Sequence, residues 1–308
     1  MGFGIMFHHF HSRGHEKRPG SIDEAEFDQL ICHLKSRYSI LDPEHFLERL
    51  LNGSLRDSDI VLSFDDSLLS QFDIALPVLK SHSIKGIFNV YSSVFMGNPD
   101  PLELFAIFRA SEFEEFDDFW GRFLEVSGQF IPDAEKSLNE RFPEDWLSNF
   151  TFYSRNEKMF RFMRDRVLSR EQYSTIMFEL MTQTPTFNSK SAVENVWMKK
   201  EHLAEIVVEG HSVGLHSHTH PTQMADLAVS VQREEYSLNK TWIESQLGVT
   251  PDWVAHPCGN YSEITLKILE ELGIQGGFRS SLTSGRFGSN LEIPREDHAN
   301  VMLELHGL

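Results

Sequence analysis

Two aspartates, Asp65 and Asp66, stand side by side directly after the apolar run at residues 60–64. An apolar run of this length, followed by a helical pattern, predicts a buried strand that leads into a helix. Two adjacent carboxylates repel each other and resist burial, so this position needs a compensating positive charge. A metal ion bound to one of them would supply that charge. Acidic pairs also cap helices, so the pair alone does not decide between these two roles.

Three histidines, His216, His218 and His220, alternate at the end of a second predicted strand, residues 212–216. Alternate residues of a strand face the same side, whereas a turn after the strand would let His216 and His220 close on one ion. Two imidazoles and one carboxylate leave positions for water and substrate, which is typical of a catalytic metal site. A lone histidine at a strand end is usually a hydrogen-bonded surface residue. Three within five residues, in a chain that also has the aspartate pair, favour a metal site.

The composition is that of a globular protein, with 308 residues, 40% hydrophobic and 24% charged. This length suffices for one large domain or two ordinary ones. The formal net charge of -18 disfavours nucleic acid or an anionic membrane as a partner. Two cysteines, Cys32 and Cys258, do not form a disulfide framework and indicate a reducing compartment. We see no signal peptide and no apolar run near the roughly 20 residues of a spanning helix, so we expect a cytoplasmic protein.

Strand and helix patterns alternate over most of the chain, which predicts parallel pairing in an α/β sheet or barrel. Strands are expected at residues 4–10, 60–64, 84–93, 212–216, 252–257 and 274–280, and helices at 21–38, 67–83, 199–210, 227–248 and 262–273. The helix at 21–38 has Ser21 as its expected N-cap and Glu24 three residues later. Its apolar residues Phe27, Leu30, Ile31 and Leu34 fall on one face.

The alternation stops at residues 98–196, where we find helical patterns and no strand. Phenylalanines recur there at helical spacing, which more often indicates a core than a ligand site: Phe105, Phe108, Phe116, Phe119 and Phe123. We therefore expect one domain over residues 1–308, interrupted by a helical insertion at about 98–196.

Four short motifs resemble those of the polysaccharide deacetylases, the NodB-homology carbohydrate esterases. "SFDDS" (63–67) resembles their "TFDDG", and "HSHTH" (216–220) resembles their H-S/T-x-x-H motif. "VAHPCGNYSE" (254–263) and "LEIPRED" (291–297) look like the third motif and a late "LPR" segment. The resemblance covers residues 1–91 and 201–308. It implies a distorted (β/α)7-type barrel with its site at the C-terminal ends of the strands.

The resemblance also implies roles for single residues. Asp66, His216 and His220 would hold one divalent metal ion, with Zn as the first expectation and Ni, Co, Mn or Fe as alternatives. Asp65 would be the general base that takes a proton from water. The backbone N–H of Cys258 would stabilise the oxyanion, with no role for its thiol.

The leaving amine needs a general acid, for which the sequence offers two histidines. "MFHHF" resembles the N-terminal "YHHI" motif of a circularly permuted subgroup of the family, which favours His8, with His9 as its neighbour. "LELHGL" resembles the late "LxH" motif of other members and offers His306. In the alternative without a catalytic role, His306 is only the residue that ends a final strand.

Three positions depart from the family pattern. Ser67 replaces the usual glycine, and Cys258 replaces an aromatic residue that often forms a wall of the pocket. Ala255 stands where much of the family has an arginine that tethers the base, so we expect Arg295 to take over this role. The smaller residue at Cys258 leaves the acyl group open between acetyl and formyl.

We therefore expect a metal-dependent amide hydrolase that removes an acetyl or formyl group from an amino sugar of a surface polysaccharide or its precursor. One alternative is a catalytically inactive, sugar-binding relative. Another is an unrelated amidohydrolase-type metallohydrolase that uses His216 and His218 as an H-x-H pair. The oligomeric state stays open.

Overall fold

The computed structural model describes residues 2–12, 14–18, 20–147, 153–282 and 288–307. The chain divides into two compact units. One unit combines Met1–Asp100 with Asn195–Leu308, and the other is Pro101–Glu194. We call them the barrel unit and the helical unit.

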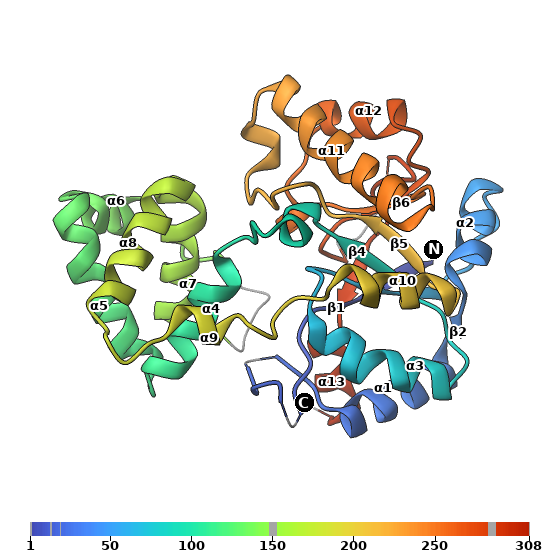
Figure 1. Ribbon diagram of the computed structural model, residues 1–308, viewed down its shortest axis with the longest axis horizontal. Coiled ribbons are helices and arrows are strands. Elements are labelled where there is room, and N and C mark those ends of the chain that lie inside the picture. The colour runs from blue at the N-terminus through green and yellow to red at the C-terminus, as the bar shows by residue number, and fades with distance from the viewer. Residues whose placement is uncertain (1, 13, 19, 148–152, 283–287, 308) are drawn as a thin grey trace. The chain divides into compact units, whose positions relative to one another are not determined.

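A parallel sheet forms the centre of the barrel unit (Figure 1). Its strands run in the order β7-β6-β5-β4-β3-β1-β8, and the short β2 pairs with β3. A parallel bridge between Phe278 of β7 and Ile293, just before β8, nearly closes the sheet on itself. The predicted (β/α)7-type barrel is thereby confirmed. The strands are β1 (Phe3–Phe7), β2 (Ser39–Ile40), β3 (Asp59–Phe64), β4 (Ile87–Val90), β5 (Ser212–Leu215), β6 (Trp253–Ala255), β7 (Gly276–Phe278) and β8 (Arg295–Asp297).

Helices surround these strands in Figure 1, namely α1 (Glu24–Arg37), α2 (Pro43–Leu51), α3 (Leu76–Ser81), α10 (Lys200–Val208), α11 (Val229–Leu247), α12 (Glu263–Glu271) and α13 (His298–Leu305). Helix α1 buries Phe27, Leu30, Ile31 and Leu34, the face that its spacing predicted. Its capping box is formed by Asp23 and Glu26, not by Ser21 and Glu24 as expected. None of the helices in the described ranges is long and apolar enough to cross a membrane.

Two elements differ from the sequence prediction. The expected helix at 67–83 is a π-helical turn, η1 (Gln71–Ala75), followed by α3. Pro77 lies in the first turn of α3, where its missing N–H costs least. The last segment forms the helix α13 and not a final strand. Asp297 caps this helix, because its side chain accepts a hydrogen bond from the N–H of Ala299.

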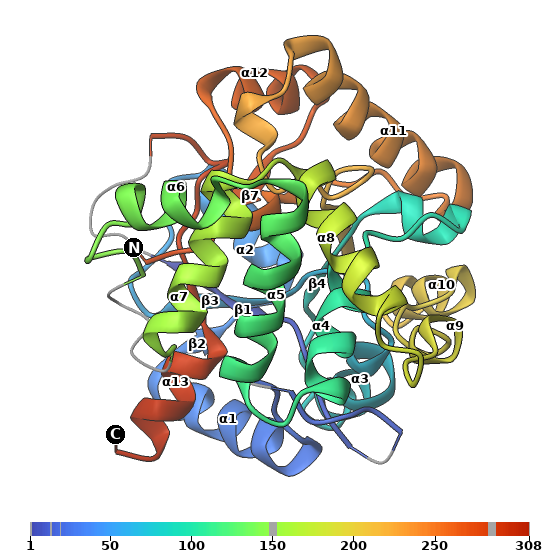
Figure 2. The same ribbon diagram turned by 90° about the vertical axis from the view of Figure 1, so that its left-hand side faces the viewer.

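The helical unit contains α4 (Leu102–Glu112), α5 (Phe116–Phe130), α6 (Ala134–Arg141), α7 (Arg155–Phe162), the π-turn η3 (Met163–Val167), α8 (Arg170–Thr182) and α9 (Ser189–Ala192). Figure 2 shows α5, α7 and α8 side by side. Phenylalanines from these helices pack edge to face in a separate core. This confirms the interpretation of their helical spacing as a core pattern.

His211, directly before β5, makes the stability of the barrel unit depend on pH. Its side chain is buried, and its Nδ1 accepts a hydrogen bond from the N–H of Gly86 at 3.0 Å. Burial, with a smaller effect of Lys85, lowers its pKa from 6.5 to about 4. The unfolded chain therefore binds more protons between these values, so stability is complete above pH 6.5 and falls as the pH drops toward 4.

We expect His211 to contribute at most about 3 kcal/mol to this loss of stability between about pH 7.5 and pH 4.5. Asparagine at this position can still accept the hydrogen bond but cannot be protonated. Urea unfolding of His211→Asn should therefore show a weaker pH dependence than that of the wild type. His306→Gln, at an exposed position, serves as the control. Equal pH dependence in wild type and His211→Asn would contradict the prediction.

Candidate metal centre

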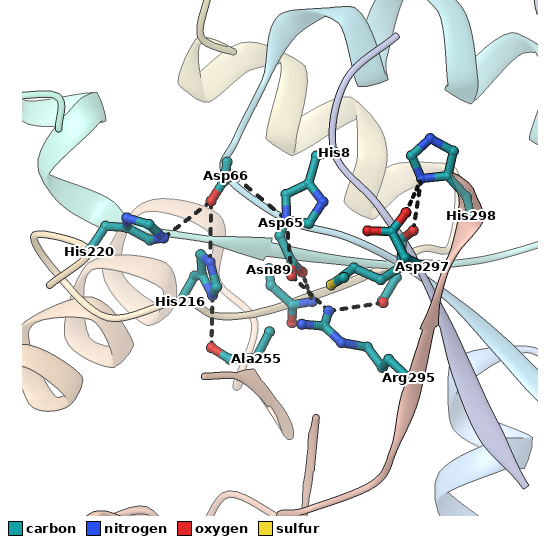
Figure 3. A network of polar contacts seen from close by, with 12 residues as sticks. His8, Asp65, Asp66, Asn89, His216, His220, Ala255, Arg295, Asp297 and His298 are labelled. Atoms are coloured by element: carbon teal, nitrogen blue, oxygen red, sulfur yellow. Dashed lines mark hydrogen bonds and ion pairs between the residues drawn. The ribbon is translucent and has the colours of Figure 1, made fainter. Parts of the chain in front are cut away.

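Three side chains from the ends of two strands meet at one point (Figure 3). Asp66 follows β3, and His216 and His220 follow β5. Their ligand atoms all lie within 4.8 Å of one another. Oδ1 of Asp66 is 3.2 Å from Nε2 of His216 and 3.4 Å from Nε2 of His220. The barrel thus brings together the carboxylate and two imidazoles that the motifs suggested.

The hydrogen bonds of the two histidines show which ring nitrogens are available. Nδ1 of His216 donates to the carbonyl oxygen of Ala255 at 2.7 Å. Nδ1 of His220 lies 3.2 Å from a carboxylate oxygen of Asp100, which is buried. A neutral imidazole with its proton on Nδ1 has a lone pair on Nε2, so both lone pairs face Asp66.

This arrangement fits a divalent cation. Within the described part of the chain, Oδ1 of Asp66 is buried without a well-formed hydrogen bond. Two lone pairs and a carboxylate oxygen that face one another repel, and a cation between them removes the repulsion. Asp66 is therefore the candidate carboxylate ligand of such an ion.

Asp65 points to a different set of partners. Its Oδ2 is 2.7 Å from Nη1 of Arg295, and its Oδ1 accepts a hydrogen bond from Asn89 at 2.8 Å (Figure 3). Both Asp65 and Arg295 have only 1% of their side chains exposed, so solvent hardly screens this ion pair. Burial favours a higher pKa for Asp65, but Arg295, His216 and His8 outweigh it, and the pKa is lowered. Asp65 is thus an ionised carboxylate beside the metal centre.

The two candidate general acids lie in very different places. Nε2 of His8, which follows β1, is 3.9 Å from an oxygen of Asp65 and 3.9 Å from one of Asp66. His306 lies at the exposed C-terminal end of α13. Because α13 follows β8, it runs back from the catalytic end of the barrel and carries His306 away from it. The geometry favours His8.

Cys258 lies in the short turn Pro257–Gly259 that follows β6. The end of this strand adjoins the metal centre, because Ala255 accepts the hydrogen bond of His216. Cys258 is exposed and takes a left-handed backbone conformation, with φ 52°. Its role as an oxyanion donor stays a prediction.

His218, the middle histidine of the motif, lies outside the cluster of ligands. Its Nδ1 is 2.8 Å from Oγ of Ser92. The H-x-H pair of the amidohydrolase alternative would need His218 beside His216 at the ion. The hydrogen bond to Ser92 gives His218 a structural partner instead.

In the loops around the site, several residues other than glycine have a left-handed backbone conformation. The φ angles are positive at Asp66 (76°), Ser67 (60°), Ser217 (65°), His220 (54°) and Cys258 (52°). Such conformations cost free energy and persist only where the surrounding structure enforces them. They explain why glycine would suit position 67, where the family motif has it.

Ser67→Gly should therefore stabilise the protein by about 0.5–1 kcal/mol, since glycine adopts a positive φ without strain. The substitution also removes a buried hydroxyl that has no hydrogen-bond partner among the described residues. Chemical denaturation of the two proteins measures the difference. Ser70→Gly, at a buried position with φ -59°, should destabilise and is the control. A Ser67→Gly variant less stable than the wild type would refute the strain argument.

Sequence reasoning missed two residues that contact the site. Asn89 interrupts the apolar strand β4, and this isolated polar residue was a usable signal. Asp100 had no such signal, because it lies in a polar segment after β4 and reaches His220 only in the folded chain.

Two other groups of potential ligands carry internal contacts instead. Asp28, Cys32 and His82 lie close together, but Nζ of Lys35 is 3.2 Å from Nδ1 of His82 and disfavours a second cation there. In the group of His11, Asp23 and Glu26, both carboxylates are engaged in the capping box of α1.

Comparison with known proteins supports the resemblance noted in the sequence. A family model described as "Polysaccharide deacetylase" matches residues 169–277. The match includes His216 and His220 and begins at Ser169, the N-cap of α8, within the segment expected to be an insertion. An uncharacterised protein, YlxY of Bacillus subtilis (strain 168), is 32% identical over 81 residues. That match spans 26% of this chain and a quarter of the length of YlxY.

Solved structures of two deacetylase-fold proteins resemble the whole chain. IcaB from Ammonifex degensii superposes with a TM-score of 0.56 at 17% identity, over 96% of this chain and 90% of IcaB. The Streptococcus pyogenes deacetylase PplD, solved with acetate, superposes with a TM-score of 0.53 at 18% identity, over 96% of this chain and 90% of PplD. At such low identity the similarity establishes a common fold.

Proposed function

We propose that this chain is a member of the polysaccharide deacetylase family, whose model matches residues 169–277, and that it removes an N-acyl group from an amino sugar. The observation that carries the proposal is the convergence of Asp66, His216 and His220 beside a second, ionised carboxylate, Asp65. Three ligands and one unligated base are what hydrolysis by activated water requires. The reaction adds water to the amide carbon and breaks the C–N bond, which gives a carboxylic acid and the free amine.

A divalent ion bound by Asp66, His216 and His220 supplies Lewis-acid chemistry and lowers the pKa of water. We expect zinc, because two imidazoles and one carboxylate suit it, although other transition metals accept the same donors. The contacts of Nδ1 of His220 with Asp100 and of Nδ1 of His216 with the carbonyl of Ala255 would leave Nε2 of each histidine available to hold such an ion.

Asp65 accepts the proton of the attacking water in this proposal. Arg295 and Asn89 fix its carboxylate on both oxygens, and each oxygen keeps a second lone pair for the proton. Arg295 thus takes the tethering role that the family assigns to an arginine at the position of Ala255. The backbone N–H of Cys258 would donate to the developing oxyanion.

The acyl group and the sugar are the open parts of the proposal. PplD, a deacetylase solved with acetate, favours acetyl, whereas Cys258 in place of an aromatic residue alters the expected pocket wall and keeps formyl as the alternative. We expect an amino sugar of a surface polysaccharide or its precursor, processed in the cytoplasm.

The test is an end-point assay with the zinc-loaded protein and a panel of N-acetylated and N-formylated amino sugars and oligosaccharides. Released acetate and formate are measured separately, and the chelated apoprotein is the control. Metal-dependent release of either acid supports the proposal and identifies the acyl group. A protein that binds zinc but releases neither acid from any member of the panel would favour the inactive, sugar-binding alternative.

We expect His8→Ala to lower turnover by about 10²–10⁴-fold, because His8 protonates the leaving amine. His306→Ala should retain the wild-type rate, since His306 lies at the far end of α13. Comparing kcat of the two variants on one substrate separates the candidate acids. A full-rate His8→Ala enzyme would exclude His8 from the role.

A further inference from the structure

The loop between the two histidine ligands is held by a buried carboxylate. Glu235, on α11, has 9% of its surface exposed. One of its oxygens, Oε2, accepts from the N–H of His218 at 2.9 Å and from that of Thr219 at 2.7 Å. The other, Oε1, accepts from the hydroxyl of Thr219 at 2.6 Å. All three donors belong to the residues between His216 and His220.

A second side chain of the same helix holds the start of the loop. Asn239, one helical turn after Glu235, is fully buried, and its Oδ1 accepts from the N–H of His216 at 3.0 Å. Helix α11 therefore accepts hydrogen bonds from the backbone N–H groups of His216, His218 and Thr219.

The loop needs such support because its backbone is unfavourable. Ser217 and His220 both have left-handed φ angles, which residues other than glycine rarely adopt. This path brings Nε2 of His220 back toward Asp66 after β5. A carboxylate that accepts two consecutive backbone N–H groups fixes the orientation of the intervening peptide, and buried charged hydrogen bonds of this kind are strong.

We propose that Glu235 is a positioning residue of the metal centre: it holds the loop 217–219 in the left-handed path that places His220 beside His216. This inference rests on the proposed metal-dependent function, which it deepens. No signal in the sequence identified Glu235, because the adjacent Glu234 is the same type of residue in the same helical pattern. Only the fold distinguishes the buried residue from its exposed neighbour.

The first test does not depend on metal. Hydrogen exchange in the apoprotein should show loss of protection at the amides of His218 and Thr219 in Glu235→Ala. Glu235→Gln should retain it, because the amide oxygen can accept both N–H groups and the amide nitrogen can donate to Thr219. Glu234→Ala, at the exposed neighbouring position, is the matched control. Unchanged protection in Glu235→Ala would overturn the proposal whether or not the protein is an enzyme.

The second test measures zinc affinity by competition with a chelator, and the visible spectrum of the bound Co²⁺. We expect Glu235→Ala to bind zinc about 10–100-fold more weakly and to change the Co²⁺ spectrum, as losses of outer contacts do. Glu235→Gln should restore both readouts to near wild type. Wild-type affinity and spectrum in Glu235→Ala would refute the positioning role. Failure of the wild type itself to bind either ion would refute the proposed function as well.

Discussion

Asp66→Ala should bind no zinc at the concentration that saturates the wild type, and its turnover should fall by about 10³-fold or more. The variant loses the ionised oxygen that both Nε2 atoms face at 3.2 and 3.4 Å. Two neutral imidazoles remain, and they cannot offset the charge of a divalent ion. The loss of a Lewis acid worth several kcal/mol corresponds to the expected decrease in rate. Metal content after dialysis and kcat on the same preparation measure both effects.

His220→Ala should show the same double loss, since it removes another of the three ligands. Asp28→Ala is the matched control, because Asp28 belongs to a second group of potential ligands that Lys35 makes unsuitable for a cation. Its metal content should equal that of the wild type. Unchanged metal content in both Asp66→Ala and His220→Ala would end the ligand assignment.

Asp65→Asn should keep its metal and lose turnover by about 10²–10⁴-fold, the usual contribution of a general base. The ligand atoms of the metal centre are untouched, but the amide cannot accept a proton from water. Both variants are thus expected to lose turnover, but only Asp66→Ala is expected to lose its zinc, although the two aspartates are neighbours in the sequence. Zinc titration and kcat, measured together, distinguish them.

The stability of Asp65→Asn must be measured beside its activity. The substitution leaves the guanidinium of Arg295 buried without its charged partner. Breaking a buried ion pair in this way lowers the free energy of unfolding by about 3–5 kcal/mol. Assays at low temperature, where the variant is folded, separate this effect from the chemistry. Near-wild-type turnover in a folded, zinc-loaded Asp65→Asn protein would remove Asp65 as the base.

Several features were predictable because they depend on neighbours in the sequence. The period of the apolar residues identified every barrel strand except the short β2 and β8, and also the buried face of α1. Adjacent polar residues at strand ends pointed to Asp66, His216 and His220, which the fold brings together. The alternative of a final strand ending at His306 was wrong, because an apolar run of that length is compatible with either a helix or a strand and the segment forms α13.

Of the partners of these residues, only Arg295 was expected, from its place in the "LEIPRED" motif, and the contacts that all of them make depend on the fold. Arg295, Asn89, Asp100 and Glu235 come from β8, β4, the segment after β4 and α11. The sequence next to each of these residues does not show which residue it contacts in the barrel. The resemblance of the motifs to those of the family was enough to propose Asp66, His216 and His220 as metal ligands and Asp65 as the base. Only the folded chain forms the ion pair between Asp65 and Arg295, the contacts at Nδ1 that leave Nε2 of each histidine available, and the hydrogen bonds from the 217–219 loop to Glu235. These contacts join segments that lie far apart in the sequence, so local patterns could not show them.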